Sequence, residues 1–397
     1  MIKIAVIGFG NIGTGLVELV ERNKDIIARD CGTEVEIKYI VDIRDFSGHP
    51  LAHKIVSDFS IVTNDPEVVL VAEMIGGSHP AFEFSMAALK AGKSVVTSNK
   101  EVVANFGDVL MRTAEENGVA YLFEAAVGGA IPIIRPMRTS LSSDSILAIN
   151  GILNGTTNYI LTSMCANGTS FDDALAEARR LGYAEANPAA DVEGTDTCRK
   201  ICILSALAYG KAFKCDDIHT EGICNITTRD ISDAYKLGVS VKLIAHTSLK
   251  EDGRIAVMVS PRFVHDKNPL CHVDDVFNGI FVSAQSDGDL MFYGRGAGQI
   301  PTAGAVLADI VEVIKHLEGK QIPASIWSIA DVSEMLPVSE NSFSYYCRVK
   351  GDKIPENTSP VSYENGESAF TIPVMKESEC DILLGDFEVS SRIRFID

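Results

Sequence analysis

Near its N-terminus the chain reads "KIAVIGFGNIGTGLVELV", from Lys3 to Val20. The apolar run Ile4–Ile7 is typical of a strand buried on both faces, and leucines and valines at helical spacing follow the glycines. Between them, "GFGNIG" is a G-x-G-x-x-G that runs from Gly8 to Gly13. A strand, this glycine turn and a helix in that order predict the first part of a dinucleotide-binding domain.

Each glycine of this fingerprint has a physical task. We expect Gly8 to make the tight turn and Gly13 to let helix and strand pack closely. Gly10 would let a pyrophosphate approach the backbone at the positive end of the helix. The alternative is a packing turn in another kind of α/β domain, but the strand and helix on either side favour dinucleotide binding.

Two charged residues near the end of the second expected strand, Val35–Ile43, bear on the choice of cofactor. Asp42 can bond a ribose 2′-hydroxyl, and Arg44 can pair with a 2′-phosphate, with Lys54 as a possible helper. Residues two apart on a strand share a face, so both can reach the adenosine ribose. NAD(H) and NADP(H) therefore both stay open, with NADP(H) slightly favoured.

The chain changes character near Pro132. Up to there strand-like and helix-like runs alternate, which predicts a parallel sheet with crossover helices. Beyond it, closely spaced strands such as 254–264 and 279–286 predict a mixed or antiparallel sheet. A later helix, after "GRGAGQ", is expected to pack back on the first domain. We thus expect an α/β protein, with a Rossmann-type doubly wound parallel sheet plus an α+β domain with a mixed sheet.

Composition narrows the partners and the compartment. A net charge of −19 over 397 residues argues against nucleic acid. No stretch approaches the roughly 20 apolar residues that a membrane helix needs, and no export signal is visible, so we expect a cytoplasmic protein. The nine cysteines are scattered, as expected of reduced thiols. Cys198 and Cys202 have no second pair or nearby histidine, so we interpret them as small core residues rather than a zinc site.

The acidic stretch "LGYAEANPAADVEGTDTCRK", from Leu181 to Lys200, has two possible meanings. Asp196 and Lys200 are four residues apart on an expected helix, so they share a face. A surface ion pair there would be worth about 0.3–0.5 kcal/mol. Alternatively the aspartate holds a lysine that donates a proton to the alkoxide formed when a hydride reduces a carbonyl. The polar cluster "NGTTNYIL" at a strand–helix junction (Asn154–Leu161) suits a polar substrate and favours the second meaning.

Several segments together resemble homoserine dehydrogenases, over about Met1–His316. This resemblance implies an NAD(P)-dependent oxidoreductase that interconverts L-aspartate 4-semialdehyde and L-homoserine, on the route to threonine, isoleucine and methionine. The segments, in chain order, are "GFGNIGTG", "EMIGG", "TSNKEVVA", "EAAVGGAIPII", "GILNGTTNYIL", "LGYAEANPAADVEGTDTCRK" and "GRGAGQIPTAGAVLAD". Another NAD(P) oxidoreductase on a related amino-acid aldehyde, and a non-catalytic dinucleotide sensor, are the alternatives.

Residue roles follow from the resemblance position by position. Lys200 would be the proton donor, with Asp196 as its partner. Glu185 would hold the substrate's α-ammonium group, with Asp191 nearby. Lys100 would lie near the nicotinamide and the substrate, although a surface lysine before a helix is the alternative. Further implied contacts with the cofactor are Asn11, Ile12, Thr14, Thr97 and Gly298.

The resemblance also implies a cation site, a dimer and a domain division. Glu124 and the carbonyls of Val127, Gly129 and Ile131 would hold sodium; a glycine-rich hinge with a capping glutamate is the equal alternative. The predicted domains are 1–133 with 300–335 for NAD(P), 134–299 for the substrate and for a homodimer, and 340–397 as a small C-terminal segment. In that segment no helix stands out between the strand-like runs 342–352 and 390–397, so it is at most a degenerate ACT-like region.

Overall fold

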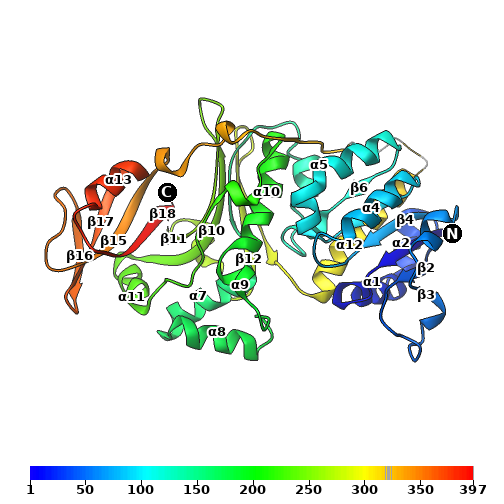
Figure 1. Cartoon of the computed structure of the whole chain (residues 1–397), viewed down its shortest axis with the longest axis horizontal. Helices are drawn as coiled ribbons and strands as arrows, with labels where there is room; N and C mark the ends of the chain where they lie inside the picture. The colour runs from blue at the N-terminus through cyan, green and yellow to red at the C-terminus, as the bar shows by residue number, and fades with distance from the viewer. Residues whose placement is uncertain (318, 320–321, 323, 397) are drawn as a thin grey trace. The chain divides into compact units, whose positions relative to one another are not determined.

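The computed structural model describes residues 1–317, 319, 322 and 324–396, and the chain divides into two units (Figure 1). Each unit has its own sheet and is described by itself. Unit 1 comprises Met1–Ser142, Ala206–Ala212 and Arg295–Ile329, and unit 2 comprises Ser143–Ser205, Phe213–Gly294 and Ala330–Asp397.

Unit 1 is built on a six-stranded parallel sheet in the order β3-β2-β1-β4-β5-β6. This is the strand order of a doubly wound dinucleotide-binding fold, which confirms the predicted fold class. The order reverses between β1 and β4, and ligands of such sheets bind at the carboxyl ends of strands at that point. The strands are β1 Ile2–Ile7, β2 Val35–Val41, β3 Ile55–Val56, β4 Val68–Glu73, β5 Ser94–Thr97 and β6 Tyr121–Leu122.

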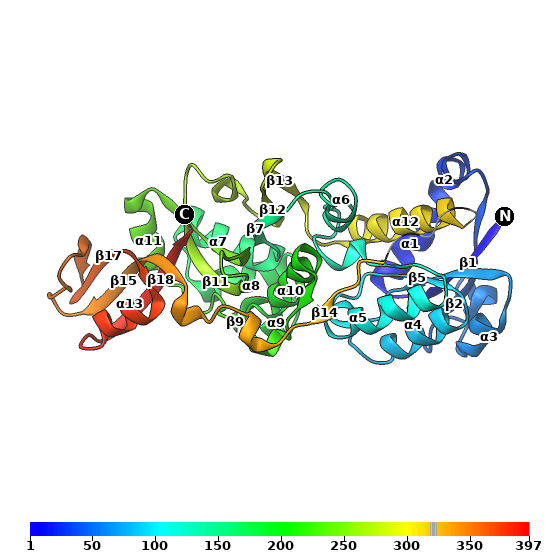
Figure 2. The same cartoon turned by 90° about the horizontal axis from the view of Figure 1, so that it is seen from above.

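The late helix α12 (Gln299–His316) packs on the N-terminal helix α1 (Asn11–Arg22), as predicted. Figure 2 shows α12, in yellow, beside α1, in blue. Leu16 of α1 and Ala303 and Val306 of α12 belong to one buried cluster with the strands. The remaining elements of unit 1 are α2 Lys24–Cys31, α3 Ser60–Asn64, α4 Ala81–Lys90, α5 Lys100–Glu116, α6 Ile134–Arg138, β8 Lys211–Ala212 and β14 Ser328–Ile329.

Unit 2 has a ten-stranded mixed sheet, as predicted for the second domain. Its main path runs β13-β12-β7-β10-β11-β18-β15-β17-β16, and β9 pairs with β11. The β10–β11 pair is antiparallel and the β11–β18 pair is parallel. The strands are β7 Ile146–Ile152, β9 His219–Thr220, β10 Val239–Leu249, β11 Ile255–His265, β12 Phe277–Ala284, β13 Gly288–Arg295, β15 Ser342–Lys350, β16 Ser359–Glu364, β17 Glu367–Lys376 and β18 Val389–Ile396.

Capping residues set the start of the helices that carry the predicted site. The Asn154 side chain accepts a hydrogen bond from the Thr157 amide at the start of α7 (Gly155–Asn167). Ser170 caps α8 (Phe171–Arg180) through the Asp173 amide. The other helices of unit 2 are α9 Ala189–Val192, α10 Thr195–Tyr209, α11 Thr228–Leu237 and α13 Glu377–Leu384. No described helix is both long and apolar enough to cross a membrane.

The C-terminal segment differs from the expectation. The expected absence of a helix is wrong, because α13 lies between β17 and β18 and buries Glu377, Cys380 and Leu384. The segment β15–β18 also continues the sheet of unit 2, since β18 pairs with β11 on one side and β15 on the other. The helix is short and acidic, and Glu377 is buried because Arg394 bonds it (Nε–Oε2 2.9 Å), which no local pattern reveals.

Candidate active site

The glycine turn after β1 has the geometry that its sequence predicted. Gly8 adopts φ +91°, a conformation that L side chains rarely adopt. A Cβ at Gly13 would lie 2.0 Å from the carbonyl oxygen of Gly8, so only glycine lets α1 approach β1 this closely. At Gly10, by contrast, no described atom lies within 4 Å of the position a Cβ would take. The turn therefore leaves open backbone at the N-terminus of α1, which fits a pyrophosphate.

The neighbouring predicted contacts lie on α1 and before α12. The Thr14 hydroxyl donates to the Gly10 carbonyl at 2.9 Å and accepts from the Gln299 amide nitrogen at 3.0 Å. This bond links the glycine turn to the start of α12, directly after Gly298, which has φ +124°. Asn11 is exposed and Ile12 is half-buried at the start of α1.

Asp42 joins the glycine turn to Arg44. Its Oδ2 accepts a hydrogen bond from the Phe9 amide at 2.8 Å, and its carboxylate pairs with the Arg44 guanidinium at 2.7 Å. The Arg44 hydrogen bond holds the pKa of the Asp42 carboxyl well below its ordinary value. The Asp42 side chain is 7% exposed and that of Arg44 is 57% exposed. The guanidinium is thus the more accessible of the two groups.

The buried carboxyl group of Glu73, at the end of β4, bonds Thr97 at the end of β5. Thr97 donates to Glu73 Oε2 at 2.6 Å and accepts from the Asn99 amide at 2.9 Å. Burial raises the pKa of Glu73 to about 7. Asn99 in turn caps α5, whose first residue is Lys100. The predicted Thr97 hydroxyl is therefore buried on Glu73, and Lys100 begins the helix.

Lys200 and Asp196 form a buried pair on α10, so the surface-pair alternative is wrong. The Lys200 ammonium donates to Asp196 Oδ2 at 2.7 Å and to the Leu153 carbonyl at 2.7 Å. Lys200 is 7% exposed and Asp196 is 4% exposed. A carbonyl and a carboxylate thus fix the position of the ammonium group where water has little access.

Asn154 is a site residue that the sequence interpretation did not single out. Its Nδ2 donates to Asp191 Oδ1 at 2.7 Å and to Asp196 Oδ2 at 2.9 Å. One amide therefore joins the acidic loop to the lysine-bearing helix. The position of Asn154 in "NGTTN", at the β7–α7 junction, is the sequence feature that could have pointed to this role. The predicted Glu185 is exposed in the loop before α9 and is not among the groups that these bonds connect.

Glu124 shows the contacts of the capping alternative. Its carboxylate accepts the amides of Ile133 at 2.7 Å, Ile134 at 3.0 Å and Arg135 at 2.6 Å. Burial raises the pKa of Glu124. These hydrogen bonds position the start of α6. Of the other predicted sodium ligands, Val127 and Ile131 are buried and Gly129 has φ +55°.

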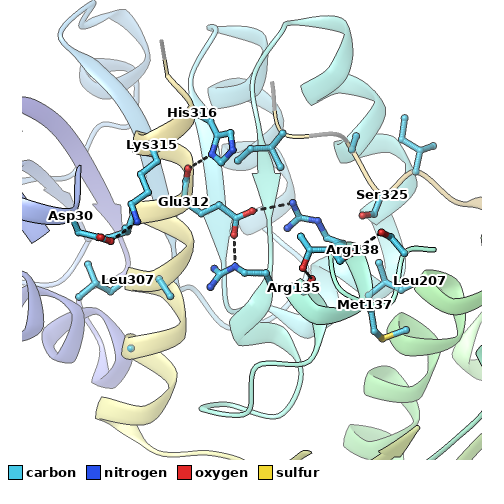
Figure 3. Close-up of a pocket in the computed structure, with 18 of the residues that line it drawn as sticks. Asp30, Arg135, Met137, Arg138, Leu207, Leu307, Glu312, Lys315, His316 and Ser325 are labelled. Atoms are coloured by element: carbon cyan, nitrogen blue, oxygen red, sulfur yellow. Dashed lines mark hydrogen bonds and ion pairs between the residues drawn. The ribbon is translucent and has the colours of Figure 1, made fainter. Parts of the chain in front are cut away.

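A cavity of about 940 Å³ in unit 1 borders this region, because Arg135 lines it (Figure 3). Its charged groups neutralise one another: Arg138 pairs with Glu312 at 3.2 Å and Lys315 with Asp30 at 2.5 Å. Arg135 also pairs with Glu312. Of the described residues that line the cavity, none belongs to the predicted site.

The strand order and the glycine turn identify unit 1 as a dinucleotide-binding domain. Comparison with known protein families makes the class specific. A family model described as "Homoserine dehydrogenase, NAD binding domain" matches residues 8–124, and one described as "Homoserine dehydrogenase" matches residues 132–311.

Relatives agree over most of the chain. A homoserine dehydrogenase of Corynebacterium glutamicum is 43% identical over 323 residues, which is 79% of this chain and 72% of the relative. The crystal structure of a homoserine dehydrogenase from Thiobacillus denitrificans superposes with a TM-score of 0.91 at 32% identity, covering 100% of this chain and 98% of that one. A hyperthermophilic archaeal homoserine dehydrogenase in complex with NADPH superposes with a TM-score of 0.68 at 28% identity, covering 81% and 99%.

The chain therefore belongs to the homoserine dehydrogenase family, and the resemblance seen in the sequence is confirmed. It is an oxidoreductase that binds a nicotinamide dinucleotide and acts on a small molecule. Family membership favours this enzyme over the non-catalytic sensor.

Proposed function

We propose that the enzyme reduces L-aspartate 4-semialdehyde reversibly to L-homoserine, on the route to threonine, isoleucine and methionine, and that Lys200 supplies the proton. The observation that carries this proposal is the burial of the Lys200 ammonium between Asp196 and the Leu153 carbonyl. Reduction of an aldehyde develops negative charge on its oxygen. A cation fixed by two acceptors can stabilise that charge and then donate the proton.

The rest of the chain binds and orients the reactants. A bound nicotinamide dinucleotide would supply the hydride. The open backbone at Gly10 supports pyrophosphate binding at the start of α1. The Asp42 carboxylate accepts hydrogen bonds from the Phe9 amide of the glycine turn and from the Arg44 guanidinium, which supports a role for Asp42 and Arg44 in binding the ribose.

The acidic loop supplies charge for an amino-acid substrate. Asp191 and Asp196 share the amide of Asn154, which keeps two carboxylates side by side despite their repulsion. A substrate ammonium group would be stabilised beside them, with the exposed Glu185 as the outer contact. Asn154 is then a positioning residue, because it holds both aspartates.

The cofactor is proposed to be NADP(H) in preference to NAD(H). The Asp42 carboxylate is already engaged by the Phe9 amide and by Arg44, whereas the Arg44 side chain is exposed. An exposed guanidinium suits a 2′-phosphate. The archaeal relative in complex with NADPH agrees with this choice.

Sodium binding and a homodimer remain predictions from the family resemblance. The Glu124 contacts support the capping alternative, and the carboxylate would have to serve both roles. Turnover in sodium, potassium and choline salts tests the first prediction. Light scattering of the purified enzyme tests the second.

The experiment that tests the proposed reaction follows the reduced-nicotinamide absorbance after mixing the enzyme with L-homoserine and NADP⁺ or NAD⁺. Growth of the signal with L-homoserine, and none with L-serine, is expected, with the higher kcat/KM for NADP⁺. Absence of signal with either cofactor, while the dinucleotide still binds, would contradict the substrate assignment.

A further inference from the structure

Three cysteines of unit 2 lie together outside the residues assigned so far. Cys198 and Cys202 lie on α10, and Cys215 comes from the 3-10 turn Cys215–Asp217. The sulfurs of Cys202 and Cys215 are 3.2 Å apart, and all three sulfurs lie within 4.8 Å of one another. The interpretation of Cys198 and Cys202 as isolated core thiols is therefore incomplete. It missed Cys215 because the fold, rather than sequence spacing, brings that residue to the helix.

The cluster is shielded on the helix side and accessible at the turn. Cys198 is 2% exposed and Cys202 is 3% exposed, whereas Cys215 is half-buried. Metal binding needs the thiolate form of each cysteine, so the ion would displace the thiol protons.

We propose that Cys198, Cys202 and Cys215 bind one thiophilic metal ion of the Zn²⁺ class. Tetrahedral zinc with metal–sulfur bonds of about 2.3 Å separates its sulfur ligands by about 3.8 Å. The measured Cys202–Cys215 sulfur separation of 3.2 Å is about 0.6 Å shorter than that value, and all three sulfurs lie within 4.8 Å of one another, so small side-chain movements would reach it. Thiolates select soft and borderline-soft ions over magnesium or calcium. Binding forms three metal–sulfur bonds, releases the thiol protons to solvent and leaves the fourth tetrahedral position to a water molecule.

The charge around the cluster suits such an ion. Three thiolates and one divalent ion together carry a single negative charge. Arg199 follows Cys198 on α10, so its positive charge lies near the cluster and would offset that excess. The half-buried Cys215 gives the ion a route of entry.

The ion would restrain the part of α10 that carries Lys200. Lys200 lies between the ligands Cys198 and Cys202 on the helix, and Cys215 would anchor that segment to the following turn. Because an ion that binds only the folded chain stabilises it by mass action, Zn²⁺ is expected to raise the melting temperature of the reduced enzyme.

Cadmium titration of the full-length, reduced, cofactor-free protein tests the site. The sulfur-to-cadmium charge-transfer absorbance should saturate at one ion per chain, counted by native mass spectrometry. Cys215→Ser should weaken the charge-transfer band and lower the affinity for cadmium by at least about 10–100-fold. Loss of a residue that only hydrogen-bonds a metal ligand already lowers metal affinity by that factor, and loss of a ligand should cost more. Cys31→Ser, an equally half-buried cysteine of unit 1, is the matched control and should keep the band.

Three results would overturn the proposal: no charge-transfer band in the wild-type protein, unchanged binding in Cys215→Ser, or an equal loss in Cys31→Ser. Cys198→Ala provides a second test if Cys215→Ser does not fold, and it should also abolish the zinc-dependent rise in melting temperature. Neither readout depends on turnover of L-homoserine, so this proposal and the proposed reaction can fail separately.

Discussion

At the scale of single residues, burial distinguishes Lys200 from an ordinary helix-surface lysine. We predict that Lys200→Ala lowers kcat by at least about 10²–10⁴-fold, because the proton donor is lost, while dinucleotide affinity is retained. Steady-state kinetics and dinucleotide titration measure the two effects. Lys214→Ala removes an exposed lysine of the same unit and should leave kcat unchanged.

Lys200→Ala leaves Asp196 buried without its ion-pair partner, which can destabilise unit 2. Lys200→Met combined with Asp196→Asn removes both charges and keeps the bulk, so it separates chemistry from folding. A kcat close to the wild-type value in either variant would remove Lys200 from the mechanism.

Asn154 both caps a helix and positions two aspartates, and one substitution separates these roles. Asn154→Ser retains an oxygen that can cap α7 but loses the Nδ2 donor to Asp191 and Asp196. We predict a stability loss of about 1–3 kcal/mol, because two carboxylates each lose a hydrogen bond, together with a raised KM for L-homoserine and a lowered kcat. Asn154→Ala should add a loss of stability. Unchanged kinetics in Asn154→Ser would show that Asn154 only caps the helix.

At the scale of elements, the glycine turn joins β1 to α1 through a close backbone approach. We predict that Gly13→Ala costs about 1–3 kcal/mol of stability, since its Cβ would lie 2.0 Å from the Gly8 oxygen. Gly10→Ala should keep its stability, because no described atom lies near that Cβ, yet bind the dinucleotide more weakly. Thermal unfolding and dinucleotide titration compare the two. Equal stability of both variants would contradict the packing role of Gly13.

Two buried carboxyls, Glu73 at the end of β4 and Asp309 on α12, give unit 1 a pH dependence whose sign follows from the shifts in their pKa values. Burial raises the pKa of Glu73 and of Asp309 to about 7 each. A carboxyl whose pKa is raised on folding stabilises the folded state fully below its ordinary pKa of about 4, and this contribution is lost as pH rises through about 7.

We therefore predict that ionisation of these two carboxyls lowers the melting temperature of unit 1 by several degrees between about pH 5 and about pH 8, since one pKa unit corresponds to about 1.4 kcal/mol. Glu73→Gln should reduce that fall, because the amide imitates the neutral acid. Glu116→Gln, at an exposed position of α5, is the control and should not. A fall of the same size in Glu73→Gln would exclude Glu73 as its source.

Elements with local signals were predictable, and those fixed by distant contacts were not. The buried strand β1, the glycine turn and the Ser170 cap each depend on neighbours within a few residues. Asn154 bonds Asp191 and Asp196, about forty positions further along the chain, so its role became visible only in the folded structure.

At the scale of the whole molecule, binding of the dinucleotide should stabilise unit 1 against thermal unfolding. We predict that NADPH raises the melting temperature more than NADH, because only NADPH has a 2′-phosphate that can pair with the exposed Arg44. Differential scanning fluorimetry at equal ligand concentrations measures this. Equal and small shifts with both ligands would contradict the interpretation of the glycine turn.

The last strand, β18, fills the position between β11 and β15 in the sheet of unit 2, although it follows every other strand of that sheet along the chain. During synthesis, β7 to β17 leave the ribosome before β18 does. Until β18 is made, the backbone edges of β11 and β15 that β18 will pair with stay exposed. These edges can be paired only after Val389–Ile396 has been synthesised. Loss of Val389–Ile396 through a premature stop would therefore expose the nascent chain to aggregation.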